Sequence, residues 1–419
     1  MTGLDAGGIA TSGGVRFLGQ RRSYWRLLIR GAVLLACTLG IYRFWLATDV
    51  RRFLWANTEV AGEALEYSGT AIELLVGFLI AIAILIPVYT AIFVAALDLG
   101  TIGKLSGLAG FSGIAVLGQY ALYRARRYRL TRTVYRGLRF HLEGSAWVFA
   151  FRAVAWWILT LLSLGLAYPF QLASLERYKM RHTFYGNLAG RFDGSGLLLF
   201  LRGIPLWLLV FAPLILAVRG FSLSIDWTAL VDALAQGGDD VMSKIEGGNP
   251  GLGAAITFAM LMTTASICLA ALLYPAFQAI VIRWWLSGLR FGGIAIRSRL
   301  RLRQVYAAYI PFLGYAIGFS IVMGIGGAAV LIVIGVMTGA GKSAAGEIVA
   351  TLLLLAGYVT AALGFSTIYR ATVQLSLWQL GAESLQLTGL EALDKVKATG
   401  RPSSAVGEGL ADALNVGGY

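Results

Sequence analysis

The chain has 419 residues, of which 58% are hydrophobic and only 13% are charged. Soluble domains carry about 25% charged residues, so this composition excludes a soluble globular protein with an ordinary solvated surface. The formal net charge is +14. The basic residues gather between apolar stretches, so membrane topology and contact with anionic lipid explain the excess better than a nucleic-acid partner does.

Several apolar stretches are long enough to cross a membrane. A bilayer core about 30 Å thick needs roughly 20 apolar residues per helix. We predict spans at eight stretches, of which 105–122 is the shortest and is rich in glycine: 24–46, 72–97, 105–122, 146–172, 197–218, 252–282, 306–337 and 344–369. The sequence therefore predicts an all-α fold, a polytopic transmembrane helix bundle of about eight spans with internal repeats.

One pattern occurs in both the first and the fourth stretch, 125 positions apart. The first copy contains Thr38-Leu39-Gly40 and the second contains Ser163-Leu164-Gly165. The matched residues that follow are Arg52 and Arg177, Thr58 and Thr183, and Gly69 and Gly194. Such a repeat predicts a membrane domain built by duplication, as in many transporters. A weaker third copy is predicted to begin at Tyr274-Pro275.

The charge of the loops gives a conflicting topology. Eight spans with the N-terminus inside place most basic residues inside, but they put the arginine-rich segment 123–145 outside. The two repeated segments would also point in opposite directions. One resolution is a helix break at the repeated Leu-Gly step, where Gly40 and Gly165 permit a re-entrant or strongly bent segment.

Composition shifts along the chain predict its organisation. The boundaries are a cytoplasmic segment 1–23, a first membrane unit 24–122, a basic connector 123–145, a second membrane unit 146–218, an acidic outside loop 219–251, a third and diverged membrane unit 252–369, and a polar tail 370–419.

Four arginines inside or at the edges of apolar stretches are the candidate ligand-binding residues: Arg30, Arg43, Arg152 and Arg202. A charge at mid-bilayer costs about 2.5–3.5 kcal/mol on insertion scales, so it pairs, faces a cavity or snorkels to the interface. A guanidinium is a fixed fork for phosphate or carboxylate, so a cavity for an anion or a lipid headgroup would use these residues. Snorkelling is the alternative.

Other motifs predict no chemistry. Residues 339–343 resemble the end of a phosphate-binding loop, but Val336 stands where the first glycine is required. The two histidines, His141 and His182, lie among arginines, which disfavour a metal cation. We therefore predict no catalytic residue, no metal, no cofactor and no enzyme. Gly314-x3-Gly318 and Gly103-x3-Gly107 fit close helix packing.

Several segments carry a family resemblance: Phe17-Leu18-Gly19, Thr38 to Trp45, Arg51-Arg52, Asn57-Thr58 and Glu66-Tyr67-Ser68-Gly69. At these residues the chain resembles the YjgN family, bacterial inner-membrane proteins of unknown function. The resemblance implies a multi-pass protein of the inner membrane. It brings no activity, substrate or catalytic residue.

Two functions remain open. The first is a transporter or channel-like protein for a small or anionic solute. The alternative is a non-transporting lipid-binding or scaffolding protein whose basic cytoplasmic face meets anionic membrane lipid. A polar cavity that reaches Arg30 and Arg152 would favour transport, whereas apolar packing there with basic residues at the interface would favour the alternative.

Overall fold

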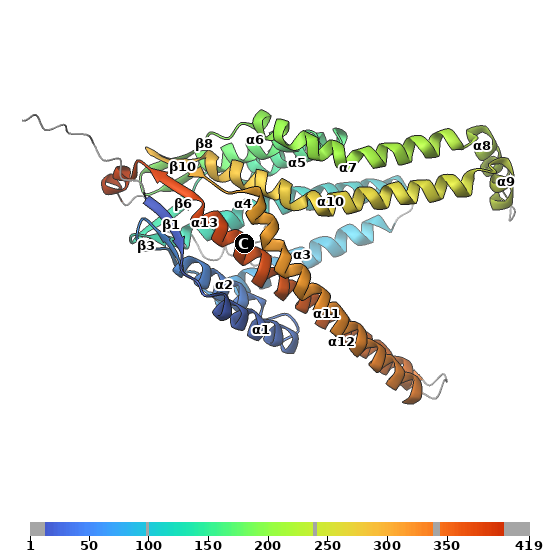
Figure 1. Cartoon of the computed structure of the whole chain (residues 1–419), viewed down its shortest axis with the longest axis horizontal. Coiled ribbons are helices and arrows are strands. Elements are labelled where there is room, and N and C mark those ends of the chain that lie inside the picture. Colours follow the sequence, from blue (N-terminus) through green and yellow to red (C-terminus); the bar gives the residue numbers. More distant parts are fainter. Residues whose placement is uncertain (1–12, 98–99, 238–240, 338–343, 398–419) are drawn as a thin grey trace, which may run out of the picture. The chain divides into compact units, whose positions relative to one another are not determined.

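A computed structural model describes residues 13–97, 100–237, 241–337 and 344–397 (Figure 1). Contacts divide the chain into two units, Met1–Gly196 with Ile282–Tyr419, and Leu197–Val281. Helices account for most of the described residues. The longer ones are α1 (Arg21–Cys37), α2 (Arg43–Ala56), α3 (Ala71–Ala96), α4 (Thr101–Thr131), α5 (Ala146–Leu162), α6 (Tyr168–Arg181), α7 (Gly196–Ser224), α10 (Leu252–Gly288), α11 (Leu302–Met337) and α12 (Ala344–Tyr369).

The shorter helical elements are α8 (Trp227–Gln236), α9 (Val241–Gly248), the π-helix η1 (Arg370–Gln374), α13 (Leu375–Glu383) and the 3-10 segment η2 (Leu390–Lys395). The strands are β1 (Gly13–Phe17), β2 (Thr58–Val60), β3 (Glu63–Ala64), β4 (Glu66–Tyr67), β5 (Thr133–Tyr135), β6 (Leu138–Leu142), β7 (Thr183–Tyr185), β8 (Leu188–Phe192), β9 (Leu289–Phe291), β10 (Ile294–Ser298) and β11 (Leu385–Thr388).

All these strands form one antiparallel sheet in the first unit, with the order β3-β2-β1-β11-β10-β9-β8-β7-β6-β5-β4. The two edge strands, β3 and β4, are separated in the chain by Leu65 alone. The sheet therefore curls until its edges meet and nearly closes as a small barrel. The prediction of an all-α fold was wrong, because the strands have only two to five residues, too few for a period of two to stand out between long helices.

The strands flank a series of helical hairpins. In the described residues, β1 and β2 flank α1–α2, β4 and β5 flank α3–α4, and β6 and β7 flank α5–α6. In the same way, β8 and β9 flank the hairpin of α7 and α10, and β10 and β11 flank the hairpin of α11 and α12–α13. The two strands that flank a hairpin are neighbours in the sheet. Every hairpin therefore begins and ends at the sheet.

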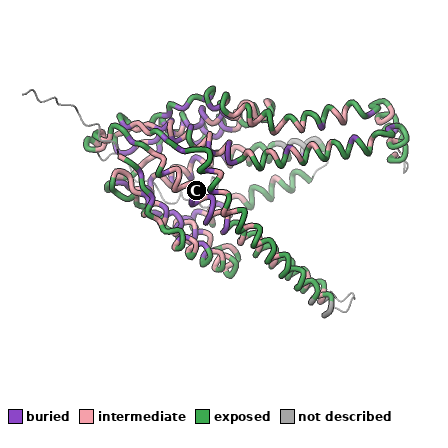
Figure 2. The backbone as a smooth tube through the Cα atoms, viewed as in Figure 1, coloured by how far each residue is buried: buried purple, intermediate pink, exposed green. Residues whose placement is uncertain are grey.

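Five of the described helices are long and apolar enough to cross a membrane: Ala71–Ala96, Gly196–Ser224, Leu252–Gly288, Leu302–Ile332 and Gly346–Glu383. The prediction of about eight spans was therefore wrong. In the most apolar windows of the last two, no residue is buried inside the protein. Figure 2 shows buried residues gathered near the strands, while the distal parts of α11 and α12 are mostly exposed.

Three predicted spans are not among these five. The stretch 105–122 lies inside α4 and includes residues whose side chains are not described, so it stays a prediction as a span. The stretches 24–46 and 146–172 are each two helices joined by a tight turn. The residues Leu39, Gly40, Leu164 and Gly165 have left-handed backbone, with φ of 49°, 92°, 51° and 89°. The helix break predicted at the Leu-Gly step is present in both copies.

A shift of 125 positions along the sequence matches whole elements to one another. It carries β1 onto β6, α1 onto α5, α2 onto α6 and β2 onto β7 without a change of length. The tip of each hairpin is strongly apolar and exposed, with Leu39 at 94% and Leu162 at 77%. Duplication as the origin of this correspondence stays a prediction.

The second unit contains most of α7 and α10, together with α8 and α9. The Ser266 hydroxyl on α10 donates to the Val210 carbonyl on α7 at 2.7 Å. Asp226 caps α8 by accepting from the Thr228 and Ala229 N–H groups. The acidic segment 219–251 thus contains two short helices.

An aromatic-x-Gly sequence stands at the end of several of the strands that precede a hairpin. A Cβ atom at Gly19, Gly69 or Gly194 would lie 2.4, 2.7 and 2.4 Å from the ring of Phe17, Tyr67 or Phe192, respectively. The ring of residue i folds over residue i+2, so only glycine leaves room for it. The repeated glycines found in the sequence are therefore explained by packing at the strand–helix junction.

We predict that Gly194→Ala destabilises the protein by about 1–3 kcal/mol, the usual cost of forcing an extra carbon into a packed site. Gly14→Ala on β1 is the matched control, because a Cβ atom there meets no atom within 4 Å. Thermal unfolding of both variants in the same detergent measures the difference. Equal stability of the two variants would contradict the packing account.

Candidate functional site

The junction between helices and strands is held by a recurring backbone hydrogen bond. In each hairpin, an N–H just after the first strand donates to a carbonyl just before the second strand, at 2.8–2.9 Å. The pairs are Leu18 with Asn57, Ser68 with Arg132, Glu143 with His182, Asp193 with Gly288, and Arg299 with Ser384. The base of each described hairpin is therefore closed in the same way.

Arginines join one hairpin to the next. The guanidinium groups of Arg52, Arg127 and Arg177 donate to the carbonyls of Gly69, Gly144 and Gly194, at 3.0, 2.5 and 3.1 Å. Each arginine lies 17 positions before its glycine, on the second helix of the preceding hairpin. The sequence repeat had pointed to Arg52 and Arg177, and in the structure both guanidinium groups donate to backbone carbonyls.

A threonine follows the end of each of the same helices. The hydroxyls of Thr58, Thr133 and Thr183 donate to the carbonyl four residues earlier, at 2.7, 2.9 and 2.8 Å. Helix C-termini leave carbonyls without intrahelical partners, and these hydroxyls satisfy one carbonyl in each case.

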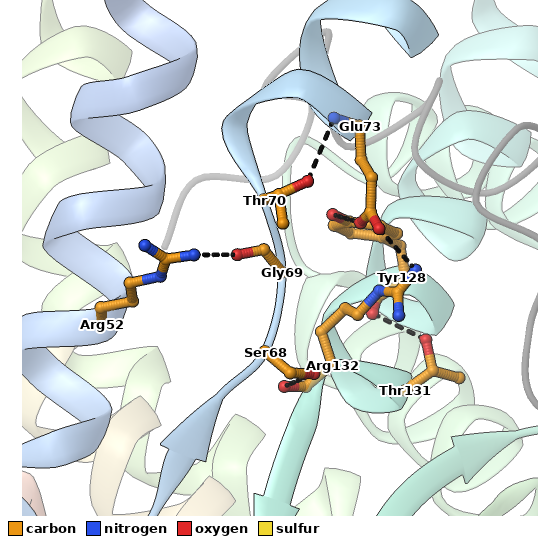
Figure 3. A network of polar contacts seen from close by, with 8 residues as sticks. All are labelled: Arg52, Ser68, Gly69, Thr70, Glu73, Tyr128, Thr131 and Arg132. Atoms are coloured by element: carbon orange, nitrogen blue, oxygen red, sulfur yellow. Dashed lines mark hydrogen bonds and ion pairs between the residues drawn. The ribbon is translucent and has the colours of Figure 1, made fainter.

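A carboxylate network strengthens the base of α3. Figure 3 shows Glu73 accepting from the Tyr128 hydroxyl at 2.7 Å and from the Arg132 guanidinium at 3.0 Å. Burial of Tyr128 and the adjacent Glu73 raise the pKa of the Tyr128 hydroxyl, so it stays protonated and able to donate. A second buried pair, Glu176 with Lys179, lies on α6. In both networks, the side chains take other side chains of the protein as partners.

Exposed arginines line the outer face of the sheet. We call Arg16, Arg139, Arg191 and Arg297 the arginine belt; they lie on β1, β6, β8 and β10, and all are exposed. Neighbouring residues in the same strands, such as Val15 and Phe17, are buried. Arg191 contacts Asp193 at 2.8 Å. The belt is thus a set of cations from strands far apart in sequence. It was not predicted. The sequence signal that could have indicated it is the Arg-Phe pair that recurs at 16–17, 139–140 and 191–192.

The four predicted ligand residues lie in different places. Arg30 is exposed on α1, and Arg43 on α2 is half-buried with its guanidinium 4.4 Å from the Phe78 ring centroid. Arg152 is exposed on α5, with its guanidinium 5.2 Å from the Tyr178 ring centroid. Arg202 is exposed on α7 in the second unit. The four residues belong to three hairpins, and their role in ligand binding stays a prediction.

The remaining motifs provide no candidate catalytic or metal site in the part of the chain that the structure describes. Residues 339–343 lie outside the described residues. Within the described residues, no group of three or more His, Cys, Asp or Glu side chains could hold a metal ion. His182 bonds the Tyr178 carbonyl at 2.8 Å, and His141 stacks on Phe184.

The profile of one protein family, described as a bacterial protein of unknown function (DUF898), matches residues 12–413. The chain belongs to this family. The match covers the whole sheet and all the described hairpins of this DUF898 member. No curated protein and no solved structure matches the chain. The match does not carry the YjgN name, so that resemblance stays a prediction.

Proposed function

We propose that this DUF898 chain is an integral inner-membrane protein that binds anionic lipid at a basic, cytoplasm-facing sheet and does not transport a solute. The arginine belt is the observation that carries the proposal. It places exposed cations at the end from which the apolar hairpins extend. Anionic lipid of the cytoplasmic leaflet attracts such cations by about 1 kcal/mol per residue.

The arrangement of the strands supports this orientation. The segments 123–145 and 283–305 both contribute strands to one sheet, namely β5, β6, β9 and β10. Both segments therefore lie on the same side of any membrane that the hairpins cross. Both are rich in arginine, so the positive-inside rule supports a cytoplasmic side for both.

The far end of the hairpin of α7 and α10 has a different charge. In the described part of 219–251, Asp226, Asp232 and Glu246 accompany Arg219 and Lys244. Because α7 and α10 are each long and apolar enough to cross a membrane, we expect these residues on the other side of it from the strands that precede α7 and follow α10. That distribution is the one expected for a periplasmic tip.

Transport of a small or anionic solute would need a cavity shared by the candidate arginines. Arg30 and Arg152 are exposed on the short helices α1 and α5, each in a hairpin with an exposed apolar tip. This is the arrangement expected of arginines that snorkel to the interface. Lipid binding is therefore the function that we propose in preference to transport.

Labelling with a membrane-impermeant maleimide tests the orientation. In a variant with Cys37 and Cys268 replaced by serine, we expect Asp232→Cys to react in intact spheroplasts. Arg301→Cys, exposed at the sheet side, should react only in inverted vesicles. Labelling of Arg301→Cys in spheroplasts would place the sheet outside and contradict the proposed orientation.

Lipid-dependent stability tests the belt. We expect unfolding to become harder as phosphatidylglycerol replaces phosphatidylcholine, and Arg16→Gln/Arg297→Gln to lose about 2 kcal/mol of that gain, about 1 kcal/mol per residue. Arg219→Gln/Lys244→Gln is the control, since it removes two exposed cations that lie near the end of α7 and on α9, away from the strands along the chain. A belt variant that responds to phosphatidylglycerol as the wild type does would overturn the proposal.

A further inference from the structure

A groove of about 750 Å³ lies between α1 and α11 in the first unit. Its lining includes Arg21, Arg22, Trp25, Gly314, Tyr315 and Gly318. We propose that this groove is a binding site for one anionic phospholipid. The phosphate lies against Arg21 and Arg22, and an acyl chain lies over Gly314 and Gly318.

The two glycines form an open floor. A Cβ atom at Gly314 or at Gly318 would meet no atom within 4 Å. The prediction that this pair packs closely against another helix was therefore wrong, and at Gly107 the surroundings are equally open. On α11 the missing side chains leave a depression four residues long in the face of a candidate span.

Aromatic rings bound the depression. The Trp25 and Tyr315 rings lie 5.5 Å apart between α1 and α11. Phe319 packs against Phe365 of α12 with ring centroids 5.2 Å apart. Because α11 and α12 have no buried residue in their most apolar windows, hydrocarbon is the medium in contact with this surface. A lipid chain is the occupant that such an apolar, open surface would take.

The charged end of the groove selects the headgroup. Arg21 and Arg22 are the first residues of α1, directly after the sheet. The Arg21 guanidinium donates to the Ser376 hydroxyl at 2.9 Å, which fixes it beside α13, and the Arg22 side chain is exposed. A guanidinium binds phosphate oxygens with two parallel hydrogen bonds. An acyl groove with two arginines at one end therefore fits an anionic phospholipid.

The direction of the groove agrees with the proposed orientation, on which this inference rests. Along α1, the lining runs from Arg21 near the sheet to Ile29 farther along the hairpin. The headgroup would thus lie at the cytoplasmic interface and the chain in the bilayer core. The groove would bind one lipid at one defined position, whereas the arginine belt would attract anionic lipid in general.

Native mass spectrometry of the delipidated full-length chain, titrated with dioleoylphosphatidylglycerol or dioleoylphosphatidylcholine, tests the site. Gly318→Leu fills the floor, and Gly324→Leu is the matched control on the same helix, because Gly324 also has open space and lies outside the groove. Arg22→Gln removes a headgroup contact, and Arg26→Gln removes an exposed arginine one turn along α1 that does not line the groove.

We expect the wild type, Gly324→Leu and Arg26→Gln to bind one phosphatidylglycerol in preference to phosphatidylcholine. Arg22→Gln should weaken phosphatidylglycerol binding by about tenfold, the value of one charge-assisted hydrogen bond. It should weaken phosphatidylcholine binding less, because the choline cation of that lipid already opposes binding beside two arginines. Gly318→Leu should lose the first site for both lipids. Thermal unfolding confirms that each variant is folded.

Binding by Gly318→Leu equal to that by Gly324→Leu would overturn the inference, and so would equal affinity of the wild type for the two lipids. These outcomes differ from failure of the proposed function. A belt variant with wild-type response to anionic lipid removes the general proposal. The groove would still be tested in that case by the difference in lipid binding between Gly318→Leu and Gly324→Leu.

Discussion

The return of every described hairpin to one antiparallel sheet is the constraint on which the structure depends. Each hairpin is closed at its base by the same N–H to carbonyl bond, of which Leu18 with Asn57 is one example. Arginines such as Arg52 then fasten one base to the next. Because unpaired backbone groups are costly near an apolar phase, these bonds hold the chain where helix changes to strand. The hairpins are free to differ in length only beyond this layer.

That constraint explains how short and long hairpins coexist. The hairpin of α1 and α2 turns back after 17 residues at Leu39 and Gly40, whereas α11 continues to Met337. Both start from adjacent parts of the sheet, since β1 and β10 each pair with β11. α11 continues along α12 beyond the length of α1, and the groove over Gly314 and Gly318 lies beside the shorter helix.

The sequence allowed some of this to be predicted. The matched Leu-Gly steps indicated a helix break, and five apolar stretches coincide with candidate spans. The sheet could not be predicted, because strands such as β3 and β4 have two residues each and are defined by partners distant in the chain. For the same reason, Arg16 and Arg297 could not be placed on one surface. Gly314 and Gly318 were predicted to pack, since a Gly-x3-Gly pattern does not reveal whether a partner helix is present.

Pairing of β1 with β11 tests the account most directly, because it joins the two ends of the chain in the sheet. Gly14 and Gln386 are register partners, so Gly14→Cys/Gln386→Cys in a background without native cysteines should form an intramolecular disulfide on mild oxidation. Glu59→Cys/Gln386→Cys is the control, because β2 is one strand farther away. Fast crosslinking of the first pair alone is the predicted result. A first pair that stays reduced, or crosslinks no faster than the control, would contradict the shared sheet.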